Sequence, residues 1–215
     1  MINILVLGHK GMLGHMVCKA FSYNEDYKII TTDKRFDEWD QSMFDNIDFV
    51  INCVGAIPQK TNKFDINWQV PIWLNENTNC KIIHPATDCE VDISNYGLSK
   101  KRATDYIKNY GKSTKIIQTS IIGPELNSNA SLLEWFLSQK GEVYGYTKAI
   151  WNGVTTLYSN KVSKYELLVK IQELYEKNDV IIMPKELGKD KSLTGNIKTK
   201  NIEEQLEELI KFNNG

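Results

Sequence analysis

A strand that runs straight into a turn with three regularly spaced glycines constrains the fold of this chain more than any other feature. Residues 2–7 form an apolar run, Gly8, Gly11 and Gly14 follow, and residues 12–23 have the spacing of a helix. In such a unit the first glycine permits a sharp turn, the second lets backbone amides approach a pyrophosphate, and the third lets the helix pack closely on the strand. The unit predicts a dinucleotide site; a tight turn with a helix-capping aspartate is the alternative.

Strand-like and helix-like segments alternate through the first half of the chain. Apolar or β-branched runs predict strands at residues 2–7, 28–32, 49–54, 81–84 and 114–122. Helical spacing predicts helices at residues 12–23, 64–77 and 96–110, the second interrupted at Pro71. This order is typical of an α/β fold with a doubly wound parallel sheet, the Rossmann fold that binds NAD(P). We therefore expect a dinucleotide-binding domain at residues 1–122 and a smaller, partly interleaved substrate-binding region at residues 123–215.

The charge balance and the distribution of apolar residues limit the kinds of partner and location that we expect for this chain. The 215 residues include 26 Lys plus Arg and 27 Asp plus Glu, a net charge of -1, which argues against nucleic acid as a partner. No apolar run approaches the roughly 18 residues of a membrane helix, and the first residues lack the features of a signal peptide. We expect a cytoplasmic protein. The four cysteines and three histidines have no metal-ligand spacing, so neither a metal site nor a disulfide framework is expected.

An acidic residue stands where a dinucleotide fold needs one. Asp33 follows the second predicted strand, 19 positions after Gly14, where a carboxylate can accept hydrogen bonds from the adenosine ribose. Asp33 favours NAD, but the adjacent Lys34 and Arg35 could neutralise a 2′-phosphate, so NADP or NAD stays open as the cofactor. Small residues also end the third strand. The residues predicted to bind the cofactor are Gly8, Lys10, Gly11, Met12, Leu13, Gly14, Asp33, Lys34, Arg35, Cys53, Val54, Gly55 and Lys100.

A tyrosine and a lysine open a later helix with catalytic spacing. Tyr96 and Lys100 are four residues apart, which puts both side chains on one helical face. A free phenol has a pKa of about 10, and we expect the Lys100 cation and an oxidised nicotinamide to favour the phenolate. Thr87 precedes this helix and can hold a substrate carbonyl oxygen against the phenol. Together with the glycine turn and Asp33, these residues indicate hydride transfer.

Several stretches resemble the extended short-chain dehydrogenase/reductase family, and most closely its dTDP-4-dehydrorhamnose reductase branch. The matching stretches are residues 11–15, 50–55, 86–89, 96–100, 119–123, 133–137 and 151–156. The resemblance implies NAD(P)H-dependent reduction of a 4-keto deoxysugar nucleotide in surface polysaccharide or deoxysugar synthesis. Thr87, Tyr96 and Lys100 would be the catalytic three, with Lys100 also holding the nicotinamide ribose. Amide, ammonium and indole groups that suit a sugar nucleotide occur at Asn127, Lys148, Trp151 and Asn152.

The chain departs from this family by being short. Only eight residues separate Thr87 from Tyr96, where relatives have a longer loop over the sugar. Two alternatives therefore stay open. One is an epimerase or dehydratase on the same scaffold, since Asp88 follows Thr87. The other is a non-catalytic regulatory subunit that binds a dinucleotide or sugar nucleotide. The identity of the sugar and the product stereochemistry are also open, as is a homodimer.

Overall fold

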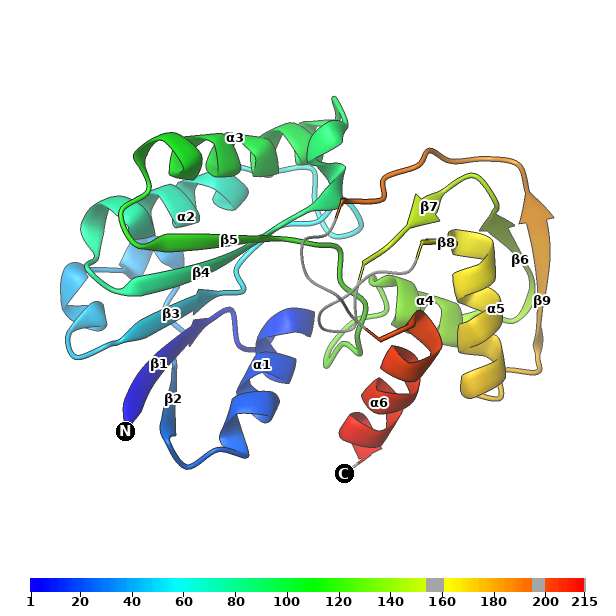
Figure 1. Cartoon of the computed structure of the whole chain (residues 1–215), viewed down its shortest axis with the longest axis horizontal. Helices are drawn as coiled ribbons and strands as arrows, with labels where there is room; N and C mark the ends of the chain where they lie inside the picture. Colours follow the sequence, from blue (N-terminus) through cyan, green and yellow to red (C-terminus); the bar gives the residue numbers. More distant parts are fainter. Residues whose placement is uncertain (154–160, 195–199, 215) are drawn as a thin grey trace. The chain divides into compact units, whose positions relative to one another are not determined.

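The computed structural model describes residues 1–153, 161–194 and 200–214, and it divides into two compact units, Met1–Gln118 and Thr119–Gly215 (Figure 1). Residues 154–156, which belong to one of the stretches that carry the family resemblance, lie outside these ranges. Within the described ranges, no helix is both long and apolar enough to cross a membrane.

The first unit contains a five-stranded parallel sheet with the order β2-β1-β3-β4-β5. Its strands are β1 (Ile2–Leu7), β2 (Tyr27–Thr31), β3 (Phe49–Asn52), β4 (Lys81–Ala86) and β5 (Thr114–Gln118). From β1 the chain moves to one side to form β2 and then to the other side for β3, β4 and β5. The predicted doubly wound parallel sheet is confirmed. In such a sheet ligands bind at the carboxyl ends of the two strands where the winding reverses, here β1 and β3.

Helices cover both faces of this sheet (Figure 1). Helix α1 (Met12–Ser22) packs on one face, and α2 (Ile66–Asn77) and α3 (Asn95–Tyr110) lie on the other. Side chains alternate between the faces along each strand because the side-chain period of a strand is two. The α1 face buries Ile4, Val6 and Ile51, and the opposite face buries Leu5, Leu7, Val50, Ile82 and, from α2, Val70 and Leu74.

The prediction that Pro71 interrupts the second helix is wrong. Helix α2 runs through Pro71 without a break. Proline removes one backbone hydrogen bond from a helix interior. Here Val70, Pro71 and Leu74 are buried, so packing against the sheet holds the helix together across the missing bond.

Two short 3-10 helices, η1 (Phe36–Glu38) and η2 (Gln41–Phe44), replace a full helix between β2 and β3. Their aromatic side chains form a cluster with Trp73 of α2. Trp39 lies at the centre of this cluster, with its ring 5.3 Å from Phe36, 6.1 Å from Trp73 and 6.3 Å from Phe44. The cluster anchors the segment after β2 to the sheet, and this segment carries the predicted cofactor residues Asp33, Lys34 and Arg35.

The second unit has its own core. Its elements are α4 (Leu132–Ser138), β6 (Gly141–Tyr146), β7 (Ile150–Trp151), β8 (Val162–Ser163), α5 (Lys164–Leu174), β9 (Val180–Lys185) and α6 (Ile202–Asn214). Strands β6 and β9 pair in parallel, and β7 and β8 pair antiparallel. Ser163 caps α5, since its hydroxyl accepts a hydrogen bond from the Glu166 amide at 3.1 Å. The fully buried side chains include Leu133, Phe136, Leu167, Leu168, Ile171 and Leu206.

Candidate functional site

Close backbone approaches require glycine at two of the three positions of the turn. Gly8 has a φ of +75°, and a Cβ there would lie 2.9 Å from the Cys53 carbonyl. A Cβ at Gly14 would lie 2.2 Å from the Gly8 carbonyl oxygen, so only glycine lets α1 start this close to β1. Gly11 is different, because a Cβ there meets only one atom, the Gly8 oxygen at 3.3 Å. The exposed side of Gly11, at the N-terminus of α1, is therefore open to a ligand.

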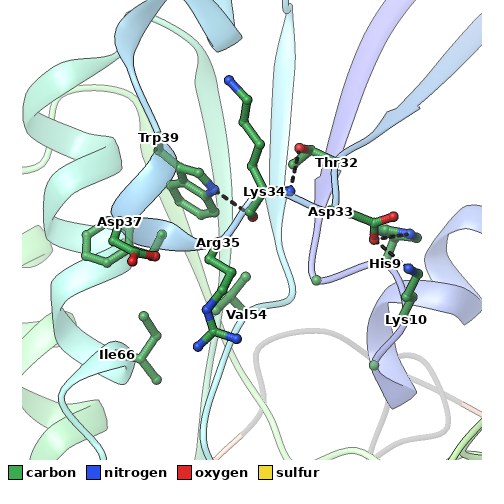
Figure 2. A pocket seen from close by; sticks show the side chains of 13 residues that line it. His9, Lys10, Thr32, Asp33, Lys34, Arg35, Asp37, Trp39, Val54 and Ile66 are labelled. Atoms are coloured by element: carbon green, nitrogen blue, oxygen red, sulfur yellow. Dashed lines mark hydrogen bonds and ion pairs between the residues drawn. The ribbon is translucent and has the colours of Figure 1, made fainter.

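A pocket of about 540 Å³ lies between this turn and the segment after β2 (Figure 2). Seven of the predicted cofactor residues line it: Gly8, Lys10, Gly11, Asp33, Lys34, Arg35 and Val54. The others, Met12, Leu13, Gly14, Cys53, Gly55 and Lys100, are not among the lining residues. Sequence reasoning missed six more: His9, Thr32, Phe36, Asp37, Trp39 and Ile66. Phe36 and Trp39 follow Arg35 closely in the sequence. These two aromatic residues could have predicted that part of the pocket lining is apolar.

Charged side chains surround the mouth of this pocket. Asp33 Oδ1 lies 2.6 Å from Lys10 Nζ and 3.7 Å from His9 Nε2. The hydrogen bond from Lys10 holds the pKa of the Asp33 carboxyl below its ordinary value. A hydrogen bond also holds the conformation of the segment after β2, because Trp39 Nε1 donates to the Lys34 carbonyl at 3.1 Å. Asp33 is thus an anion presented beside the glycine turn.

Thr87 and Tyr96 come together at the carboxyl end of β4. The first four residues after Thr87 form a 3-10 helix, η3 (Asp88–Val91), which Thr87 caps by accepting from the Cys89 amide at 3.2 Å. The Thr87 hydroxyl also donates to Asp88 Oδ1 at 3.1 Å, and it lies near enough to the Tyr96 phenol to lower the pKa of that phenol. The shortened connection therefore brings both hydroxyls to one place.

In the free protein the surroundings of Tyr96 favour the neutral phenol. The pKa of Tyr96 is raised, first because the phenol is buried and then because Cys89, Asp88 and Glu90 lie near it, and these effects outweigh the lowering effect of the Thr87 hydroxyl. A raised pKa keeps the phenol protonated at neutral pH. In this state Tyr96 can act as a proton donor.

Lys100 is a buried cation one helical turn after Tyr96. Burial lowers its pKa from 10.5 to about 8, although Glu90 and Cys53 act in the opposite direction. Its Nζ lies 3.4 Å from the position a Cβ of Gly55 would take, at the loop that follows β3. Among the residues that the structure describes, none forms a hydrogen bond with this ammonium. Lys100 is therefore a donor available to a ligand hydroxyl at the crevice.

A buried asparagine, which sequence reasoning missed, ties this loop to the helix that carries Tyr96. Asn67 Oδ1 accepts from the Ala56 amide at 2.7 Å, and Asn67 Nδ2 donates to the Ala56 carbonyl at 3.0 Å. The same Nδ2 donates to Ser99 Oγ at 3.1 Å, and Ser99 Oγ donates to the Tyr96 carbonyl at 2.7 Å. Asn67 thereby fixes the distance between the loop after β3 and the first turn of α3.

Replacing Asn67 by alanine is expected to lower the free energy of unfolding by about 3 kcal/mol, because the part-buried amide and carbonyl of Ala56 lose their partner. Chemical denaturation measures this change. Asn77→Ala on the same helix is the matched control, since the half-buried Asn77 makes one hydrogen bond, to the Trp73 carbonyl. Equal losses in the two variants would contradict the assigned role of Asn67.

A second buried asparagine fixes the same loop from the side of β3. Asn52 Oδ1 accepts from the Val54 amide at 3.1 Å, and its Nδ2 lies 3.2 Å from His84 Nδ1. Burial, followed by the nearby Lys100 charge, lowers the pKa of His84 to about 3, so this histidine is neutral. In the described ranges, no group of three His, Cys, Asp or Glu residues is placed to hold a metal ion.

The predicted substrate residues all lie in the second unit, and three of them have partners there. Asn152 is buried, and its amide group bonds both the carbonyl and the amide of Leu193, at 2.6 and 2.8 Å. Trp151 is buried with Lys164 Nζ 4.3 Å from its ring centroid. Lys148 forms an exposed ion pair with Glu186, and Asn127 is exposed. Asn152 and Trp151 thus help to build the unit itself.

No protein-family model and no curated protein matches the sequence. Solved structures do match over essentially the whole chain. A dTDP-4-dehydrorhamnose reductase from Clostridium acetobutylicum is 17% identical with a TM-score of 0.74, and the match covers all of both chains. A dTDP-glucose 4,6-dehydratase from Bacillus anthracis in complex with NAD is 17% identical with a TM-score of 0.67, covering all of this chain and 97% of that one.

A UDP-glucuronic acid 4-epimerase from Bacillus cereus, in complex with UDP-glucuronic acid and NAD, also matches. It is 16% identical with a TM-score of 0.70, and the match covers 98% of each chain. Reductase, dehydratase and epimerase therefore share one scaffold with this chain. The resemblance predicted from the sequence is confirmed at the level of the fold: the chain has the fold of dTDP-4-dehydrorhamnose reductase and the related extended short-chain dehydrogenases/reductases that act on sugar nucleotides.

Proposed function

We propose that this protein reduces a keto group on a nucleotide-linked deoxysugar with NADH or NADPH. The observation that carries the proposal is that the Tyr96 phenol lies close to the Thr87 hydroxyl, one helical turn before the buried ammonium of Lys100. Thr87 directly follows β4, and Tyr96 and Lys100 belong to α3. These residues lie in the first unit, which also contains the glycine turn. A hydroxyl pair next to a buried cation suits proton transfer to a carbonyl oxygen.

The residues of the first unit fit a dinucleotide. The open side of Gly11 at the N-terminus of α1 suits a pyrophosphate, and Asp33 suits the adenosine ribose. The apolar side chains of Val54, Ile66 and Trp39 in the same pocket suit the adenine ring. Lys100 would hold the nicotinamide ribose. The cofactor, when bound, supplies the hydride that a reductase adds to the carbonyl carbon.

The chain's own residues would supply the proton and the alignment. Thr87 holds the ketone oxygen by a hydrogen bond, and Tyr96 donates its phenol proton to that oxygen as the hydride adds to the carbon. The ketone would become a secondary alcohol with the hydride that a bound cofactor supplies, and the Tyr96 phenolate would regain its proton from solvent. The second unit, with Asn127 and Lys148 on its surface, is assigned to the sugar nucleotide.

A dehydratase or epimerase is the second candidate, because the Asp88 carboxylate accepts a hydrogen bond from Thr87 and is buried at the site. Assays with NADH or NADPH and dTDP-, UDP- and GDP-linked 4-keto sugars, and with NAD and the corresponding 4-hydroxy sugars, separate the candidates. A reductase consumes one reduced cofactor for each sugar converted. Conversion without net consumption indicates a dehydratase or epimerase, and binding without conversion indicates a regulatory subunit.

The two glycines of the turn are expected to respond differently to alanine. Gly14→Ala places a methyl group 2.2 Å from the Gly8 oxygen, so we expect a loss of at least 2 kcal/mol in the free energy of unfolding. Gly11→Ala meets only the Gly8 oxygen at 3.3 Å and is expected to keep nearly normal stability. Its methyl group occupies the open side where the pyrophosphate is assigned, so cofactor affinity falls about tenfold or more. Thermal unfolding and titration calorimetry test both points; unchanged affinity in Gly11→Ala would rule out this phosphate site.

A further inference from the structure

Glu90 is a carboxylate on the short connection between Thr87 and Tyr96, and it contacts two other elements of the first unit. The residue lies in η3 and is half-buried. Its Oε1 accepts a hydrogen bond from the Thr104 hydroxyl at 2.7 Å, and its Oε2 accepts a longer one from Gln118 Nε2 at 3.5 Å. One side chain therefore joins η3 both to α3 and to the end of β5.

Thr104 places the first of these contacts on the same face of α3 as Tyr96 and Lys100. It follows Lys100 by four residues and Tyr96 by eight, so the three side chains lie along one face of the helix. Thr104 is only 1% exposed, and Glu90 gives its buried hydroxyl a partner. Glu90 therefore contacts α3 one turn beyond Lys100.

Gln118 connects the other oxygen of Glu90 to the strand that Thr87 follows. It is the last residue of β5, and its partner on β4 is the residue directly before Thr87. Its Nε2 also donates to the Thr87 carbonyl at 3.3 Å. The backbone of η3 lies against the first turn of α3, since a Cβ at Gly97 would be 2.2 Å from the Cys89 carbonyl oxygen. These contacts set the position of Thr87 relative to α3.

The negative charge of Glu90 acts on both titratable groups of the site. Burial lowers the pKa of Lys100, and the Glu90 charge acts in the opposite direction. Burial raises the pKa of Tyr96, and Glu90 adds to this increase. Other titratable groups that face this pair are Asp88 and Cys89 of η3, His84 of β4 and Cys53 of the loop after β3. Glu90 thus favours a charged ammonium and a neutral phenol together, which is the state that can donate a proton.

We propose that Glu90 is a positioning residue for the reduction: its carboxylate holds η3 between α3 and β5, which keeps Thr87 close to Tyr96, and its charge stabilises the Lys100 ammonium. This inference rests on the proposed function. Glu90 acts through these three residues and not on the ketone itself. The short connection therefore carries its own alignment device.

A double-mutant cycle between Glu90→Gln and Lys100→Met tests the electrostatic part of the proposal without any cofactor. Glutamine keeps an oxygen for Thr104 but removes the charge. The gain in stability from Lys100→Met at pH 7 is therefore expected to be larger in the Glu90→Gln background than in the wild type. The denaturant midpoints of the four proteins measure this difference. Equal gains in the two backgrounds overturn the proposal.

The pH dependence of NADH affinity reports the same charge in a second way. Because the pKa of Lys100 is about 8, the affinity of the wild type should fall as the pH rises through that value. Glu90→Gln should shift this fall to lower pH by about half a unit, since the ammonium loses its counter-charge. Glu76→Gln is the matched control, because Glu76 accepts a hydrogen bond from the Tyr106 hydroxyl of α3 at 2.9 Å. Its profile should follow the wild type, and an unshifted profile in Glu90→Gln overturns the proposal.

Glu90→Ala tests the alignment, because it removes the oxygen that Thr104 holds as well as the charge. Single-turnover reduction at about pH 6 is expected to slow about tenfold or more, while NADH affinity changes less than threefold and Glu90→Gln keeps most of the rate. A wild-type rate in Glu90→Ala overturns the proposal. Failure of the wild type to bind or oxidise NADH instead overturns the proposed function, and the double-mutant cycle still decides whether Glu90 acts on Lys100. Thermal unfolding of each variant verifies that the fold is retained.

Discussion

Tyr96→Phe is expected to lower the rate of keto-sugar reduction about a thousandfold, because the ketone oxygen loses its proton donor. The ring itself should stay in place. Its edge-on contact with Phe64, at 5.8 Å between centroids, does not involve the hydroxyl, so the fold and the cofactor affinity are expected to stay within about twofold. Single-turnover measurement of nicotinamide absorbance gives the rate of the chemical step.

Tyr110→Phe is the matched control for this loss. Tyr110 is on the same helix, α3, but is exposed at the other end, so its phenol is expected to contribute nothing to the rate. Similar rates for Tyr96→Phe and the wild type would remove Tyr96 from the chemistry. A fall in cofactor affinity as large as the fall in rate would also contradict the account, since it would give the hydroxyl a binding role.

Lys100→Met is expected to make the protein more stable and at the same time inactive. The folded protein holds the Lys100 ammonium with a pKa of about 8 instead of 10.5, which corresponds to a cost of about 3 kcal/mol at pH 7. Methionine fills a similar volume without the charge, so the free energy of unfolding should rise by up to about this amount. Cofactor affinity should fall about tenfold, because the assigned partner of the nicotinamide ribose is lost.

The difference in the free energy of unfolding between Lys100→Met and the wild type is expected to depend on pH with a defined sign. The folded-state pKa of Lys100 is depressed, so the cost is fully present below pH 8 and disappears as the pH rises toward 10.5. The stability advantage of Lys100→Met over the wild type should therefore be largest at pH 7 and vanish near pH 10.5. Denaturant unfolding across this range measures it.

Lys101→Met is the control for the stability measurement, because Lys101 is exposed and paired with Asp105 at 2.7 Å. A surface change of this kind is expected to alter the free energy of unfolding by less than about 0.5 kcal/mol at any pH. If Lys100→Met is less stable than the wild type at pH 7, the ammonium already has a stabilising partner, and its assignment to a ligand is wrong.

Local patterns in the sequence were sufficient to predict the scaffold. The run before Gly8, the glycine spacing and the β-branched segments each depend on neighbouring residues, so the parallel sheet and its helices could be read directly. The proximity of Thr87 and Tyr96 could also be predicted, because Thr87 directly follows a strand and Tyr96 lies at the start of the next long helix. Pro71 was misread for the opposite reason: burial of Val70 and Leu74 against the sheet overrides the local preference of proline.

Features that depend on long-range contacts were not accessible from the sequence. Asn67 bonds Ala56 and Ser99, which are 11 and 32 residues away, and no spacing rule connects them. The raised pKa of Tyr96 follows from burial and from the acidic groups of η3, which act against the effect expected from Lys100. Likewise, the sequence places Lys34 and Arg35 side by side, whereas the pairing of Lys34 with Asp40 sends the two side chains in opposite directions.

Transfer of deuterium from a labelled cofactor tests the central claim most directly. The protein is mixed with a dTDP-linked 4-keto deoxysugar and NADPH that carries deuterium at the transferring position, and the sugar is analysed by mass spectrometry and NMR. The account predicts one deuterium on the carbon of the former ketone, one oxidised cofactor for each product, and loss of the signal in Tyr96→Phe. Tight cofactor binding with an unlabelled sugar, across the dTDP-, UDP- and GDP-linked panel, would contradict it.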